Sequence, residues 1–254
     1  MDCPELPIHE RTQVSSVHDG DTLRLTDGRR VRLIAINAPE LARDGNAEQP
    51  LARASREAVE AFLAETQFVH LSFESRRADR YGRVLAHVTL PSGRNLESHL
   101  ISQGLAFPLA VPPDLAFSDC LMAQAKQAQK AGLGLWNDPY WQAVAAHQLN
   151  DLEPAFRRVC GVVQKVDQSG DLFIELEGDL VLRVAHRDMR YFEHSEFDIE
   201  RLRSAVGMHI TVSGWLIDRS DNEMVKARGY KPWLMQVRTP YALDWAACPK
   251  IESN

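Results

Sequence analysis

VHDGDTLRLTDGRRVRLIAINAPE, residues 17–40, is the stretch that decides the fold, because it contains two short strands joined by a tight turn. Apolar residues at positions 23, 25, 31 and 33 alternate with polar ones, and Asp27-Gly28 between them suits a two-residue hairpin turn. Side chains alternate along a strand, so Arg32 should face away from the apolar set. The hairpin therefore brings Asp21 and Arg32 close together.

The end of this stretch adds oxygen ligands and a base. Asn37-Ala38-Pro39-Glu40 ends the strand, because a proline cannot donate to the ladder. Hard cations bind oxygen, which the carboxylate of Asp21, the side chain of Asn37 and the carbonyl of Ala38 would supply. Glu40 is a candidate general base for a water molecule, and the guanidinium of Arg32 is a candidate bidentate donor to phosphate oxygens. This set suits hydrolysis of a phosphodiester; the alternative is an ordinary solvated acidic hairpin.

A second motif, Asp79-Arg80-Tyr81-Gly82-Arg83, adds further arginines. With it, the sequence resembles the staphylococcal (micrococcal) nuclease family of thermonuclease-like domains. The resemblance rests on DGDT at 19–22, on Arg32 followed by NAPE at 37–40, and on DRYGR at 79–83, in that order. It continues through NLESHLISQGLA at 95–106 and QAKQAQKAGLGLW at 124–136, and so covers the first 140 residues.

The resemblance implies a five-stranded β-barrel of the OB type with three helices, and calcium-dependent cleavage of DNA and RNA. The implied metal ligands are Asp21, Asn37 and the backbone carbonyl of Ala38. Arg32 and Arg83 would hold the scissile phosphate, and Glu40 would act as the general base or orient the water. Further residues are expected just behind the ligands or against the substrate, namely Asp19, Thr22, Asp79 and Tyr81.

The sequence departs from the family pattern at two places. The family's type member has aspartate where this chain has Asn37, so we expect weaker calcium binding, with Mn²⁺ or Mg²⁺ as alternative ions. The type member also has two tyrosines after the position of Ala106, where this chain has FPLAVPP at 107–113. The choice between DNA and RNA and the strandedness therefore stay open, with a preference for single strands as one expectation. The alternative function is a non-catalytic module that binds nucleic acid or a partner on a nuclease scaffold.

Composition limits the class of protein. The 254 residues carry a net charge of −6, which argues against a basic clamp for non-specific binding of nucleic acid. No apolar run reaches the length of about 20 residues that a membrane span needs, so we expect no membrane partner; protein partners stay open. The chain begins Met1-Asp2-Cys3 without a signal peptide, and we expect a leader to have been replaced by Met1.

Four cysteines suit disulfides in an oxidising compartment, so we expect a periplasmic or secreted protein. Three pairings are open. We expect Cys3 to pair with Cys120, because both lie in the nuclease half and outside the obvious core strands. Cys160 lies in an apolar strand, where it is expected to be a buried thiol.

We expect a mainly β protein with helices (α+β) and two domains. Residues 1–140 form the nuclease-like domain, 141–156 a linker, 157–245 a second small OB-like barrel and 246–254 a tail. The second barrel is expected because five short apolar-rich segments, at 159–166, 172–176, 180–184, 210–217 and 233–237, surround a helix near 199–205. The polar loop 41–50 flanks the candidate site and is expected to become ordered on substrate.

Overall fold

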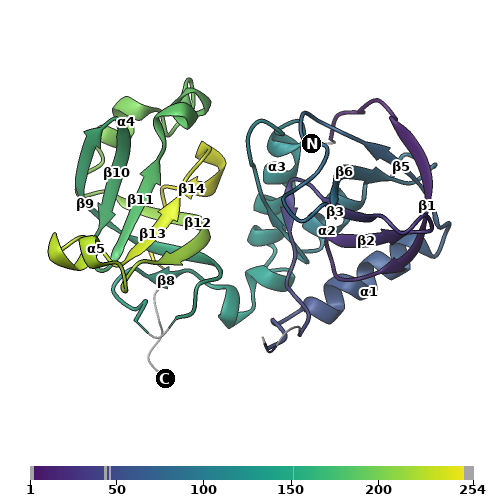
Figure 1. The fold of residues 1–254 in the computed structure, drawn as a ribbon, viewed down its shortest axis with the longest axis horizontal. Helices are drawn as coiled ribbons and strands as arrows, with labels where there is room; N and C mark the ends of the chain where they lie inside the picture. The colour runs from purple at the N-terminus through teal and green to yellow at the C-terminus, as the bar shows by residue number, and fades with distance from the viewer. Residues whose placement is uncertain (1–2, 43–44, 46, 151, 249–254) are drawn as a thin grey trace. The chain divides into compact units, whose positions relative to one another are not determined.

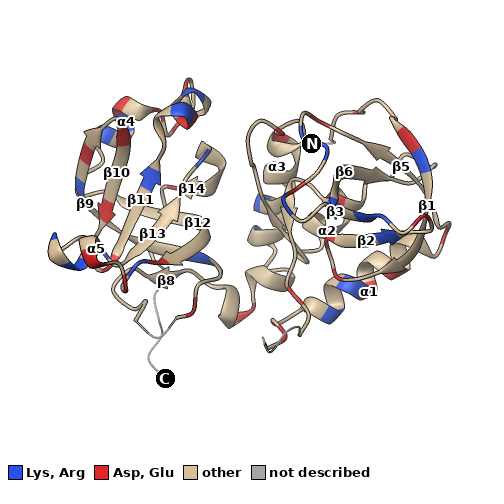
Figure 2. Cartoon of the chain, in the orientation of Figure 1, with Lys and Arg blue, Asp and Glu red and all other residues tan. Residues whose placement is uncertain are grey.

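The computed structural model of the protein describes residues 3–42, 45, 47–150 and 152–248. The chain divides into two compact units, Met1–Tyr140 and Trp141–Asn254, here called the first and second domains (Figure 1). Each has its own core of buried apolar side chains. Every helix within the described ranges is too short or too polar to cross a lipid bilayer. Acidic and basic residues are interspersed along the elements of both domains (Figure 2).

The first domain is a closed barrel of five strands, which confirms the expected OB-type fold. Its strands are β1 (Glu10–Val17), β2 (Thr22–Leu25), β3 (Arg30–Leu33), β5 (Phe68–Ser72) and β6 (Val84–Thr89). They follow one another around the barrel as β1-β2-β3-β6-β5, and only the β3–β6 pair is parallel. The apolar positions 23, 25, 31 and 33 of the decisive hairpin are all buried inside, as the alternation predicts.

Three α-helices pack on this barrel: α1 (Ala52–Leu63), α2 (Leu96–Ser102) and α3 (Ser118–Lys130). Helix α2 begins after Asn95, whose side chain accepts a hydrogen bond from the Ser98 N–H at 2.7 Å and so caps the helix. Gly104 follows it at φ +68°, and a Cβ there would lie 2.3 Å from the Leu133 carbonyl oxygen. Helix α3 has Phe117 at its N-cap, which makes no side-chain capping hydrogen bond. The 3₁₀-helices η1 (Gly134–Trp136) and η2 (Pro139–Trp141) follow.

The return strand of the hairpin is shorter than expected. Strand β3 ends at Leu33, and Ala35 has a φ of +64°, which turns the chain away from the barrel. Ile36–Asn37 then forms β4, which pairs with β7 (Phe107–Pro108) outside the barrel. Asn37 is thereby fixed by a strand seventy residues further along the chain.

The second domain contains a second closed ring of five strands, as the sequence predicts. These are β9 (Phe156–Ser169), β10 (Asp171–Leu176), β11 (Leu180–Val184), β12 (His209–Asp218) and β13 (Trp233–Gln236). The ring runs β9-β10-β11-β13-β12 and closes through pairing of β12 with β9, again with one parallel pair, β11–β13. The two barrels therefore share one strand order, with helices between their third and fourth strands.

Short elements extend the second barrel. Strand β8 (Val144–Ala145) pairs in parallel with β9, and β14 (Leu243–Asp244) pairs with β12. The stretch 141–156, expected as a linker, thus includes part of this sheet. The remaining elements are η3 (His186–Phe192), α4 (Ile199–Arg203), α5 (Glu223–Ala227) and η4 (Pro240–Ala242). Part of the expected tail, residues 249–254, and residues 43, 44 and 46 of the expected flexible loop lie outside the described residues.

Each domain holds one disulfide. The Cys3–Cys120 bond of 1.99 Å confirms the predicted pairing in the first domain. The expectation of a buried thiol at Cys160 is wrong, because Cys160 bonds to Cys248 at 2.07 Å. Cys160 is buried, as expected. Its partner Cys248 lies near the chain end, where no sequence pattern indicates a contact with Cys160.

Candidate active site

Asp21 is the centre of the candidate site, and it is 1% exposed. It lies in the turn just before β2. Its Oδ2 accepts a hydrogen bond from the Ala38 N–H at 3.0 Å and lies 3.1 Å from Nη2 of Arg32. Its Oδ1 accepts from the Thr22 hydroxyl at 3.1 Å. The carboxylate is therefore oriented from three directions.

The turn that carries Asp21 packs tightly on helix α1. A Cβ at Gly20 would lie 2.0 Å from Oγ of Ser55 and 2.7 Å from Cβ of Ala38, so only glycine fits. Asp19, on the other side of Gly20, accepts a hydrogen bond from the Asp21 N–H at 3.0 Å. The DGD sequence thus places a second buried carboxylate directly behind Asp21.

Arg32 is held on the barrel face predicted from strand alternation. Its side chain is 13% exposed and donates from Nη1 to the carbonyl oxygens of Leu33 and Ile36, the latter at 3.0 Å. These carbonyls belong to the irregular turn around Ala35, so the turn and the guanidinium stabilise each other. Nη2 lies beside the Asp21 carboxylate.

Asn37 and Ala38 follow this turn, and both are buried. The pairing of Asn37 with Phe107 fixes their backbone, while the Ala38 N–H is bound to Asp21. Within the described residues, the Asn37 side-chain amide makes no hydrogen bond. Its oxygen is thus available to a ligand.

Arg83 reaches the site from the turn before β6. Asp79 fixes this turn by accepting from the backbone N–H groups of Tyr81 and Arg83, both at 2.9 Å, and from Arg83 Nε at 2.7 Å. Burial would raise the pKa of Asp79, but these bonds outweigh it and lower the pKa. Nη1 of Arg83 lies 3.4 Å from the Thr22 hydroxyl, which links it to Asp21.

Glu40 and Tyr81 lie at the edge of this group. Glu40 is exposed, and its backbone is fixed by Gln49, whose Oε1 accepts from the Glu40 N–H at 2.8 Å. Tyr81 is 60% exposed, with its ring centroid 5.8 Å from Cζ of Arg83. Sequence reasoning missed Gln49 and Ser55, and no local pattern marks either of them.

The electrostatics favour a cation. Burial raises the pKa of Asp19 well above its usual range, and the charges of Asp21 and Glu40 raise it further, against the opposing effects of the hydrogen bond from the Asp21 N–H and of the Arg32 charge. Among the described residues no group of three His, Cys, Asp or Glu side chains has metal-binding geometry. The expected ligands are instead one carboxylate, that of Asp21, together with the amide oxygen of Asn37 and a backbone carbonyl. These oxygen donors fit a hard divalent ion.

The predicted residues therefore lie in one connected group, from Asp79 and Arg83 through Thr22 and Asp21 to Arg32 and Ala38. Residues 30–138 match the family model described as "Staphylococcal nuclease homologue". A thermonuclease of Staphylococcus intermedius is 33% identical over 126 residues, which are 48% of this chain and 74% of that protein. The chain belongs to the staphylococcal nuclease family. An uncharacterized endonuclease of Escherichia coli is 31% identical over 134 residues, which are 52% of this chain and 78% of that protein.

The matched region locates the staphylococcal nuclease domain in the first domain. These relatives bear the names of hydrolytic nucleases, which agrees with the phosphodiester chemistry expected from the residues. The second domain lies beyond residue 138, outside the matched family model.

Proposed function

We propose that this nuclease is a Ca²⁺-dependent phosphodiesterase that cleaves both DNA and RNA, using Glu40 as the base and two arginines to hold the phosphate. One observation supports this most: Arg32 on β3 is joined to Asp21 directly, and Arg83, in the turn before β6, is joined to it through Thr22. Two guanidinium groups around one carboxylate can bind the oxygens of a single phosphate.

The residues that would hold the ion are Asp21, Asn37 and the carbonyl of Ala38. A bound Ca²⁺ would supply positive charge for a phosphate oxygen in the transition state. The neutral amide of Asn37 lowers the negative charge of the ligand set, so Mn²⁺ and Mg²⁺ are tested as alternatives.

The other residues move a proton and neutralise charge. Glu40 accepts a proton from the attacking water as the water oxygen bonds to phosphorus. The bond from phosphorus to the leaving oxygen breaks, and that oxygen keeps the bonding electron pair and takes a proton from solvent. Arg32 and Arg83 donate to the non-bridging oxygens, on which negative charge grows. Arg32 is already immobilised by the Leu33 and Ile36 carbonyls, so little entropy is lost when it binds phosphate.

We further propose that the protein works in the periplasm or outside the cell. The support is one disulfide in each domain and no free cysteine among the described residues. Structural disulfides persist mainly in oxidising compartments.

The decisive experiment is digestion of single-stranded DNA, duplex DNA and RNA in Ca²⁺, Mg²⁺, Mn²⁺ or chelator. We expect metal-dependent cleavage, fastest on single strands, and a loss of about 10²–10⁴-fold in kcat for Glu40→Gln. Glu57→Gln removes a carboxylate from an exposed position of α1 and serves as the matched control. Full activity of Glu40→Gln would refute the assigned base.

The same experiment distinguishes this proposal from the competing function. A non-catalytic module that binds nucleic acid or a protein would cleave none of the substrates with any ion. The exposed position of Glu40 beside the buried carboxylates favours catalysis, because a binding module needs no base at this rim.

A further inference from the structure

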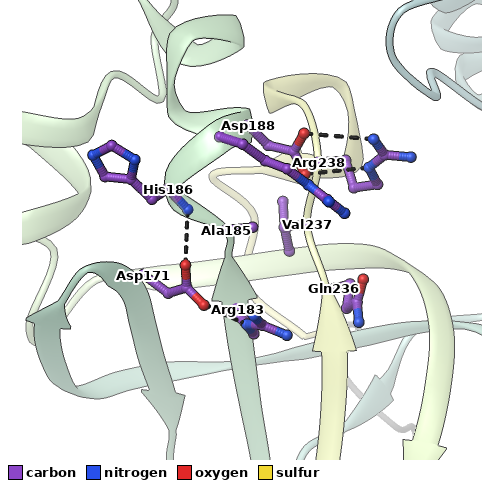
Figure 3. Close-up of a pocket in the computed structure, with 9 residues that line it drawn as sticks. Asp171, Arg183, Ala185, His186, Asp188, Gln236, Val237 and Arg238 are labelled. Atoms are coloured by element: carbon purple, nitrogen blue, oxygen red, sulfur yellow. Dashed lines mark hydrogen bonds and ion pairs between the residues drawn. The ribbon is translucent and has the colours of Figure 1, made fainter.

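A pocket of about 370 Å³ opens on the second domain, at the start of β10 and beyond the ends of β11 and β13. Figure 3 shows its polar lining, which comes from these three neighbouring strands and the start of η3. The residues that line it are Asp171, Arg183, Ala185, His186, Arg187, Asp188, Gln236, Val237 and Arg238. All of these residues belong to the second domain.

Two ion pairs orient two of the arginines in this pocket. Asp171 binds Arg183, with distances of 2.7 Å from Nε and 2.6 Å from Nη2 to one carboxylate oxygen. Asp188, whose side chain is 5% exposed, accepts from Arg238 Nε at 3.2 Å and lies 3.5 Å from its Nη2 (Figure 3). A guanidinium has five N–H groups, so each arginine keeps donors for a further acceptor.

The pocket is locally cationic in an acidic domain. Residues 141–254 contain 14 Lys and Arg against 17 Asp and Glu. The pocket lining reverses this balance, with three arginines against two aspartates. Arg187 is exposed, and within the described part of the chain its side chain has no carboxylate partner. The uncompensated charge favours an anion over a metal ion, because both carboxylates are already neutralised.

The two barrels carry similar residues at corresponding positions of their second and third strands. In the first, Asp21 precedes the second strand, Arg32 lies on the third, and Asn37 follows five residues later. In the second, Asp171 begins the second strand, Arg183 lies on the third, and Asp188 follows five residues later. Both Asp–Arg pairs are in contact, at 3.1 Å and 2.6 Å.

One difference separates the two edges. Glu40 lies three residues after Asn37, whereas Tyr191 lies three residues after Asp188. The second edge has the arginines that suit a phosphate but no counterpart of the base. OB barrels commonly bind oligonucleotides on the face of their second and third strands, where Arg183 lies.

We propose that this pocket binds a phosphate group of a nucleic-acid strand and does not cleave it. The choice of nucleic acid as the source of the phosphate rests on the proposed function, whereas the phosphate chemistry rests on the arginines of the pocket. Arg183 and Arg238 are pre-oriented donors, Arg187 supplies the excess charge, and Gln236 adds an amide donor beside them.

The test measures the binding of a labelled single-stranded oligonucleotide to the full chain by fluorescence anisotropy, in the presence of chelator. Cleavage plays no part in this readout, so failure of the proposed nuclease activity would leave it intact. Arg187→Glu is the main variant, and Arg228→Glu is the matched control, because Arg228 is also exposed in the second domain but lies outside the pocket.

We expect Arg187→Glu to weaken binding by about tenfold or more and to reduce the slope of log K against log salt by about 0.7. Arg228→Glu should change affinity by less than about threefold. Equal effects of the two variants would overturn the proposal. Arg187→Gln, which removes the charge without reversing it, replaces Arg187→Glu if the latter does not fold.

A second readout locates the ligand and identifies its source. Amide NMR signals of residues 186–188 and 236–238 are followed with the oligonucleotide, a nucleoside monophosphate and inorganic phosphate. Shifts at these residues support the pocket, and they identify a strand or a free phosphate according to which probe saturates at the lower concentration. The absence of shifts with all three probes would refute it.

Discussion

Asn37 is the residue where the candidate site departs most from a carboxylate cluster. It lies next to Ala38, whose N–H is bound to Asp21, and its own amide makes no hydrogen bond within the described residues. Asp21 carries one negative charge, which Arg32 partly neutralises at 3.1 Å. A divalent ion therefore meets less negative charge than two carboxylates would provide.

Asn37→Asp should strengthen calcium binding. The added carboxylate raises the charge of the ligand set, and we expect roughly tenfold tighter Ca²⁺ binding by isothermal titration calorimetry. Asn137→Asp adds the same charge at an exposed position of the first domain and should leave the affinity within about twofold. Unchanged affinity in Asn37→Asp would show that this side chain is not a ligand.

At the residue scale, the sequence predicts those contacts that follow from strand alternation and tight turns. The proximity of Asp21 and Arg32 follows from the hairpin, because both lie at its open end. The contact of Arg83 with Thr22 needs the parallel β3–β6 pairing, which joins distant segments. The requirement for Gly20 depends on Ser55 of α1, and no local pattern encodes that contact.

His87 connects three elements of the first domain. It lies on β6, is fully buried, and its ring lies 4.0 Å from that of Phe117. Its Nδ1 lies 3.0 Å from a carboxylate oxygen of Glu97 on α2, and its Nε2 lies 2.9 Å from one of Glu74, beyond the end of β5. Burial alone would lower the pKa of His87, but the two carboxylates outweigh it and raise the pKa to about 9.

The first domain should therefore lose stability as the pH rises. The folded-state pKa of His87 lies above the unfolded value of about 6.5, so the stabilisation is complete below pH 6.5. It is lost as the pH rises through about 9, and the full loss amounts to about 3 kcal/mol. Urea unfolding between pH 6 and pH 10 measures this loss of unfolding free energy.

His87→Gln provides the control for this pH dependence. The variant has no proton to lose in this range, so its free energy of unfolding should be lower at pH 6 and fall less steeply. Glu74→Gln leaves one carboxylate beside the imidazole and should give an intermediate slope. Equal slopes in wild type and His87→Gln would assign the pH dependence to other groups.

At the element scale, local signals predict most of the structure. Asn95 and Gly104 mark the two ends of α2, and the five strands of the second barrel are found within a few residues of their expected bounds. The pairings of β4 with β7 and of β8 with β9 were not predicted. Each involves a two-residue strand that is too short to show alternation. Strand β7 lies seventy residues after β4, and β8 lies in the expected linker.

At the scale of the whole molecule, two barrels with one strand order carry different chemistry. The first has a buried carboxylate pair, two arginines and an exposed glutamate. The second repeats an Asp–Arg pair at the same edge and adds Arg187 and Arg238, with no base in place of Glu40. Sequence reasoning found the second barrel but not its pocket, because the pocket forms only when β11 and β13 become neighbours.

The two domains should unfold separately. Each has its own apolar core, and each has a disulfide that closes a long loop, with sequence separations of 117 and 88 residues. Closing loops of this size stabilises a fold by about 4–5 kcal/mol in the chain-entropy model. Removing one disulfide should therefore act on one domain only.

Calorimetry of the paired variants tests this independence. Cys160→Ser with Cys248→Ser should lower the unfolding temperature of one transition by more than about 10 °C and leave nuclease activity at 25 °C unchanged. Cys3→Ser with Cys120→Ser should instead lower the other transition, and activity should be lost at correspondingly lower temperature. If either pair of substitutions shifts both transitions equally, the two domains unfold as one cooperative unit, and the second barrel stabilises the nuclease domain as well as binding phosphate.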